Sequence, residues 1–145
     1  MGGSGMANSI SDTKRDELKA LRQGLLGLHK MLLDLERVAY ERVRGRIGNS
    51  YEFLQLVLKD PWFDWLHRLS ELIVQIDESL DTRDAEHPVT DEDAIALLVR
   101  AKTLLSPAEE GTEFQKNYFL ALQQSPDVVL LHAEITRVLG KGVSG

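Results

Sequence analysis

The chain has 145 residues, 43% of them hydrophobic, and a formal net charge of -6 from 23 acidic and 17 basic side chains. Its size is enough for one domain with a substantial core, and its negative charge argues against nucleic acid or an anionic membrane as a partner. The absence of cysteine excludes disulfides, thiolate metal sites and cysteine nucleophiles. No apolar run reaches the ~20 residues that span a bilayer, so we expect a protein that does not enter the membrane. The absence of cysteine fits the reducing cytoplasm, where we expect the protein to lie.

The two ends of the sequence differ from the rest. The glycine-rich residues 1–5 precede a second methionine, Met6, as in a cloning remnant, and residues 142–145 are similar. We expect a disordered extension over residues 1–9, a helical domain over 10–140 and a tail over 141–145.

A long first helix is predicted from Asp12 to Arg44. Its apolar residues alternate at spacings of three and four, which places them on one helix face. They are Leu18, Leu21, Leu25, Leu28, Leu32, Leu35 and Ala39. A second apolar row beside the first makes this face wide, as in a bundle rather than a two-stranded coiled coil. Gly24 and Gly27 each cost about 1 kcal/mol relative to alanine in a helix, and they indicate close helix contact or a bend.

Two helices are predicted next, separated by a proline. Asn49 and Glu52 have the spacing of a capping box for a short helix from Ser50 to about Lys59. Asp60 and Pro61 then form a helix-start signal, and a helix is predicted from Pro61 to Leu80. Its heptad of large apolar residues is Trp62, Leu66, Leu69, Ile73, Ile76 and Leu80.

The second half of the chain is predicted to be helical as well. A polar loop over Asp81–Val89 leads to a fourth helix that begins with Asp91, and a fifth covers about 113–124. A sixth helix begins at Ser125-Pro126 and ends at Gly140. The fold class is therefore all-α, a single helical bundle with a four-helix core (the first, third, fourth and sixth helices) and one or two short extra helices.

The aromatic residues near Pro61 are the first candidate site. On an α-helix Trp62 and Trp65 share a face from which Phe63 points away, so either the short second helix covers Phe63 or an aromatic patch lines a cleft. We take Tyr40, Trp62, Trp65 and His67 as candidate ligand-binding residues.

Four arginines near the end of the first helix are the second candidate site. They are Arg37, Arg42, Arg44 and Arg46, and they would bind an anion or an acidic partner. Cations are also stabilised at a helix C-terminus without any ligand, and both interpretations stay open here. Glu36 has the spacing of an ordinary surface residue.

The histidines are the basis of an alternative function, a metal- or haem-binding bundle that uses His29, His67 or His132. A carboxylate-bridged di-iron bundle needs two Glu-x-x-His pairs, and the nearest match is the single Asp64-Trp65-Leu66-His67. We therefore expect histidines at boundary or solvent positions, with no metal, no cofactor and no catalytic residue.

The segment Asp60-Pro61-Trp62-Phe63-Asp64-Trp65-Leu66 resembles a motif, Asp-Pro-Trp-Phe-x-Trp-Leu, of a family of small uncharacterised bacterial all-helical proteins. This resemblance implies a bacterial cytoplasmic origin and supplies no functional residues. The function we expect is a non-enzymatic interaction or small-ligand-binding module. Its partner would be a protein helix, a small apolar ligand near the aromatic residues, or a second copy of the chain in a homodimer.

Overall fold

The computed structural model describes residues 9–81 and 88–144, the last three by their backbone alone. Within these ranges the chain forms α-helices, one 3-10 helix and no strand, which confirms the predicted all-α bundle. The expected extension over residues 1–9, apart from Ser9, lies outside the described residues. So does most of the predicted Asp81–Val89 loop, including His87.

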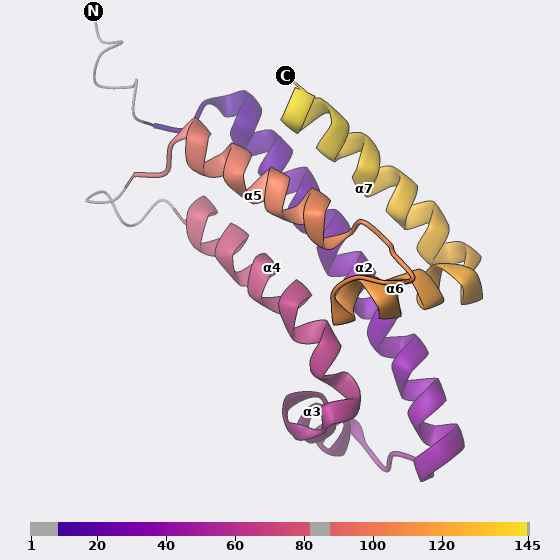
Figure 1. Cartoon of the computed structure of the whole chain (residues 1–145). Coiled ribbons are helices and arrows are strands. Elements are labelled where there is room, and N and C mark those ends of the chain that lie inside the picture. The colour runs from indigo at the N-terminus through magenta and orange to yellow at the C-terminus, as the bar shows by residue number, and fades with distance from the viewer. Residues whose placement is uncertain (1–8, 82–87, 145) are drawn as a thin grey trace, which may run out of the picture.

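Four helices form the core. They are α2 (Asp12–Arg44), α4 (His67–Leu80), α5 (Asp91–Leu104) and α7 (Pro126–Ser144), and each runs antiparallel to the helix before it (Figure 1). α2 contacts the other three, and α5 also packs against α4 and α7. These are the four helices that the apolar patterns predict for the core. α7 continues past the predicted end at Gly140, because a glycine permits a helix to end without forcing it to do so.

The leucine row of α2 is the centre of this core. The first five leucines, Leu18, Leu21, Leu25, Leu28 and Leu32, are fully buried, whereas Leu35 and Ala39 are only half-buried. The reason is length, since the last turns of α2 extend beyond the start of α7 (Figure 1). The predicted row of apolar residues is therefore correct, and only its last two residues are not surrounded by other helices on all sides.

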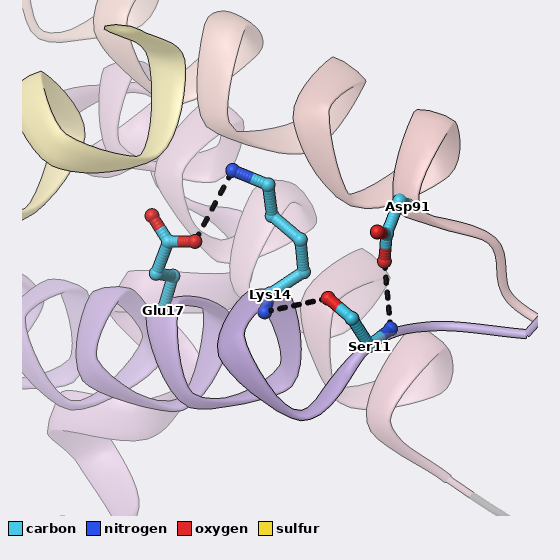
Figure 2. Close-up of polar contacts among 4 residues, drawn as sticks. All are labelled: Ser11, Lys14, Glu17 and Asp91. Atoms are coloured by element: carbon cyan, nitrogen blue, oxygen red, sulfur yellow. Dashed lines mark hydrogen bonds and ion pairs between the residues drawn. The ribbon is translucent and has the colours of Figure 1, made fainter. Parts of the chain in front are cut away.

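A polar contact joins the start of α2 to the start of α5 (Figure 2). The backbone N–H of Ser11 donates to Asp91 Oδ1 at 2.7 Å, and Ser11 Oγ accepts from the N–H of Lys14 at 3.2 Å. Lys14 Nζ lies 3.2 Å from Glu17 Oε1. Ser11 thus caps α2 and at the same time ties it to the first residue of α5.

Three smaller elements cover the end of the bundle at which α4 and α7 begin. α3 (Ser50–Lys59) packs against the 3-10 helix η1 (Pro61–Leu66), and α6 (Glu113–Gln124) packs against η1 and α7. α3 lies at the end of the molecule opposite the start of α2 (Figure 1). Because η1 also contacts α2 and α4, it is the element around which this end of the fold is assembled.

The predicted continuous helix from Pro61 to Leu80 is wrong in its first six residues, which form η1 before α4 begins. Asp60 caps η1 through Trp62 N–H at 2.9 Å, and Pro61 stands at the first helical position. A 3-10 helix has three residues per turn, so Phe63 shares a side with Leu66 and turns inward. Phe63 is fully buried against Phe53 of α3, with ring centroids 5.8 Å apart. The short second helix therefore covers Phe63.

None of the helices in the described ranges is both long enough and apolar enough to cross a membrane.

Two glycines mark the closest approach of α2 and α7. A Cβ atom added to Gly24 would lie 2.7 Å from Ile135 Cγ1, whereas one added to Gly27 would lie 3.3 Å from Leu131 Cδ2. Ile135 is buried and cannot move away, but Leu131 is half-buried and is met at the end of its side chain. The glycine at position 24 is required by packing, and the one at position 27 is not.

We therefore expect the same substitution to have opposite effects at the two positions. Gly27→Ala should raise the free energy of unfolding by up to about 1 kcal/mol through helix propensity. Gly24→Ala should lower it by about 1–3 kcal/mol, because the overpacking outweighs that gain. Urea denaturation of both variants measures this, and a stabilised Gly24→Ala would contradict the close contact.

Candidate functional site

The loop between α2 and α3 builds the first candidate site. Gly45 ends α2 with φ of 100°, a conformation that favours glycine. The next turn is fixed by Glu41, whose carboxylate accepts from the N–H of Ile47 at 2.9 Å, and by the burial of the Ile47 side chain. Asn49 caps α3 as predicted, but the capping box is only half formed, because Glu52 accepts from Gly48 N–H at 2.8 Å instead of from Asn49 N–H. The loop is therefore rigid, and it turns α3 back against the end of α2.

A hollow of about 550 Å³ lies between the end of α2 and α3, and we call it the basic pocket. Its cations are Arg44, Arg46 and Lys59, and its aromatic residues are Tyr40 and Tyr51. In the described residues none of these three cations lies within ion-pair distance of a carboxylate. The pocket is lined by positive charge in a protein whose net charge is negative.

Two carboxylates also line the basic pocket, but both already accept backbone hydrogen bonds. Glu52 Oε2 accepts from Gly48, and Asp60 Oδ1 accepts from Trp62. These hydrogen bonds from backbone N–H groups hold the two carboxylates in place, in the same way as at a helix N-cap. The three cations therefore keep their N–H donors for a ligand or partner.

Arg44 is held by aromatic rings. Its guanidinium carbon lies 6.0 Å from the centroid of Tyr40 and 5.9 Å from that of Trp62, within the range of a cation–π interaction. Tyr40 and Trp62 meet edge to face at 5.4 Å. These contacts give Arg44 a defined position at the wall of the pocket.

The outer face of α3 carries an apolar stripe next to the pocket. Tyr51, Leu54 and Leu58 are three and four residues apart and are 70%, 52% and 58% exposed. Residues at this spacing share one helix face. Tyr51 belongs both to this α3 stripe and to the lining of the basic pocket, so the two surfaces are continuous.

The structure brings only part of the predicted site residues together. Tyr40, Arg44 and Arg46 line the basic pocket, and Trp62 lies beneath Arg44. Arg37 lies 5.0 Å from the Phe53 ring centroid and 3.9 Å from Glu41, outside this pocket. Arg42 is exposed at the same helix end without lining it.

The other two predicted ligand residues lie elsewhere. Trp65 is 7% exposed and packs against Phe114 at 5.3 Å, on the side of η1 that faces α6. The N–H at Nε2 of His67 donates to the carbonyl oxygen of Val57 at 3.2 Å. Tyr40 lines the basic pocket and Trp62 packs against it, whereas Trp65 and His67 do not line this pocket.

Glu36 is a residue that helical spacing did not single out. It is half-buried, and a small cavity of about 70 Å³ beside it is lined also by Trp65, Asn117 and Gln124. Burial raises the pKa of Glu36, while the indole N–H groups of Trp62 and Trp65 act in the opposite direction. Both indole nitrogens are buried, and neither has a hydrogen-bond partner of ordinary geometry among the described residues. No sequence pattern links residue 36 to residue 117, and this environment could not have been found from spacing.

The histidines of the alternative function do not converge as a group. His29 bonds Ser70 Oγ at 2.9 Å, near His67, and His132 Nδ1 bonds the hydroxyl of Tyr118 at 2.7 Å. Burial lowers the pKa of His29, and the charge of His67 lowers it further, while burial alone lowers that of His132. Residues 9–81 and 88–144 contain no cluster of three or more histidine, aspartate or glutamate side chains suited to a metal ion. This geometry gives the metal or haem alternative no support.

Comparison with known proteins finds no match to this chain among protein families, curated proteins or solved structures. The resemblance of the Asp60–Leu66 motif to small bacterial helical proteins therefore stays a prediction, and the site must be interpreted from its own chemistry.

The half-buried Glu36 predicts a pH dependence of stability. Its pKa is raised above the ordinary value of 4.5 in the folded state, so the folded protein binds this proton more tightly than the unfolded chain does. Its contribution to stability is complete below pH 4.5 and is lost as the pH rises through the raised pKa. Glu36→Gln, which does not titrate, should therefore gain stability relative to the wild type as the pH rises to about 7.

Urea denaturation across this range measures the difference. Glu71→Gln, at an exposed carboxylate of α4, is the control. A difference for Glu36→Gln that does not change with pH would contradict the buried setting of this carboxylate.

Proposed function

We propose that the protein is a non-enzymatic interaction module that binds an acidic amphipathic helix of a partner protein, across the α3 stripe and the basic pocket. The observation that carries this proposal is the continuity of the two surfaces through Tyr51. One surface is apolar and exposed, and the other has cations without carboxylate partners.

The apolar part supports a helix as the partner. The stripe of Tyr51, Leu54 and Leu58 covers two turns of one face, which is the length over which an amphipathic helix presents its own i, i+3, i+7 anchors. Exposed apolar residues that form a continuous row next to charged ones are typical of protein-binding surfaces. α3 has no buried residue of its own, so its apolar content is not explained by the core alone.

The charged part supports an acidic partner. Arg44, Arg46 and Lys59 line the pocket, whereas the chain as a whole carries a net charge of -6. A partner with carboxylates beside its apolar row would meet these cations, and arginine forms bidentate bonds with carboxylates. Complementary charge of this kind sets orientation and association rate.

We further infer a cytoplasmic location, supported by the lack of cysteine. A second copy of the chain is the other partner that the α3 stripe could bind, because each copy would bring an apolar stripe to the contact. The like charges of the two basic pockets would oppose such a homodimer.

The test uses a synthetic helical peptide with leucines at i, i+3 and i+7 flanked by glutamates. Its binding to the whole protein is followed by NMR titration, and a dissociation constant of about 10–100 µM is expected for a surface of this size. Leu58→Ser should weaken binding about tenfold, through loss of one apolar anchor. Arg44→Gln should weaken it and reduce its salt dependence.

Matched variants separate the site from general effects. Val74→Ser removes an apolar residue that is 52% exposed on α4, and Arg42→Gln removes a cation at the same helix end outside the pocket; neither should change binding. Equal binding of a scrambled peptide with the same charge would contradict the proposal. So would light scattering that shows a dimer which Leu58→Ser dissociates, because the stripe would then bind a second copy.

A further inference from the structure

A second hollow lies on another side of η1, where η1, α4, α5 and α6 meet. Its volume is about 540 Å³, within the 300–1,000 Å³ or so that is usual for small-molecule sites. Its apolar wall is made by Trp65, Leu104 and Phe114. We call it the four-element pocket.

The wall of this pocket is rigid. Trp65 and Phe114 are 7% and 2% exposed, and their rings pack at 5.3 Å. The end of α5 is joined to the start of α6 by Gln115, whose side chain donates to the carbonyl of Thr103 at 2.9 Å and accepts from the N–H of Thr112 at 3.1 Å. A preformed wall lowers the entropic cost of binding a small ligand.

The rim of the pocket carries two charges of each sign. Asp64 and Arg68 come from η1 and α4, Arg100 from α5 and Glu113 from α6. None of the four is within ion-pair distance of an opposite charge among the described residues, although Arg100 donates to the side-chain oxygen of Gln75. Unpaired charges of opposite sign therefore surround one apolar hollow without neutralising one another.

This arrangement selects for a class of ligand. A simple anion would face Asp64 and Glu113, and a simple cation would face Arg68 and Arg100, so either would meet repulsion that offsets its attraction. A ligand with one positive group, one negative group and an apolar body would satisfy both pairs and cover the aromatic wall.

The geometry points to a binding site for a free amino acid with a large apolar side chain, in its zwitterionic form. Its carboxylate pairs with Arg68 or Arg100, and its ammonium group pairs with Asp64 or Glu113. The apolar side chain packs on Leu104 and on the exposed part of Trp65. This site is separate from the α3 stripe and the basic pocket, and it adds a small-molecule ligand to the proposed interaction function.

The experiment titrates the whole protein with L-phenylalanine and follows the indole N–H signal of Trp65 by NMR, assigned with a Trp62→Phe variant. We expect a saturable shift with a dissociation constant of about 1 mM or lower. N-acetyl-L-phenylalanine lacks the positive charge and L-phenylalanine amide lacks the negative charge. Each should bind about tenfold or more weakly.

Variants test the rim directly. Arg100→Gln and Glu113→Gln should each weaken binding of L-phenylalanine about tenfold, and Arg100→Gln should discriminate less between L-phenylalanine and its amide. Glu110→Gln, an exposed neighbour outside the pocket, should bind as the wild type does. Glu113 lies in the first turn of α6, where a carboxylate stabilises the helix, whereas Arg100 and Glu110 lie outside helix caps and first turns. A thermal melt of Glu113→Gln therefore checks that its fold is intact.

Two results would overturn the inference. One is the absence of any shift with L-phenylalanine or L-leucine at about 10 mM. The other is equal binding of the acetylated, amidated and free forms, which would mean that the pocket recognises only an aromatic ring.

Discussion

The fully buried leucine row of α2 is the contact on which the rest of the structure depends. α4, α5 and α7 all pack against it, so their mutual arrangement follows from their shared partner. Burying one leucine side chain contributes about 1.5–3 kcal/mol, which makes five in a row the largest block of apolar stabilisation in the fold. The row is buried only as far as Leu32, and the rest of α2 reaches beyond the core helices to carry the residues of the basic pocket.

The 3-10 helix η1 determines what surrounds that free end. Residues three apart share a side of a 3-10 helix, so Trp62 and Trp65 lie near one another, and the indoles of both act on Glu36. Phe63 of η1 packs against Phe53 of α3, and Trp65 packs against Phe114 of α6. η1 thus joins both surface helices to the core helices α2 and α4.

The sequence predicts this fold well wherever the spacing of its apolar residues is regular. The leucines of α2, the caps of α3 and the four core helices follow from spacing and from residue type alone, because amphipathic periodicity reports directly which face is buried. It does not report the winding of a six-residue turn, so the heptad predicts an α-helix from Pro61 where the chain forms η1. Nor does it report neighbours from distant segments, and the environment of Glu36 depends on α6, some 80 residues later in the chain. The arginine cluster at the end of α2 is visible in the sequence, but only the folded loop shows that Arg44 and Arg46 share the basic pocket. Arg37 lines a neighbouring hollow with Arg46, and Arg42 lines neither.

α3 has a property that the other helices lack, since none of its side chains is fully buried. Amide hydrogen exchange and proteolysis act first on elements whose local opening exposes little apolar surface. Detachment of α3 would uncover Phe63 and leave the leucine row of α2 untouched. Opening of α3 should therefore cost less free energy than opening of a core helix. The residues that face outward on α3 are carried on a helix that half-buried side chains hold in place.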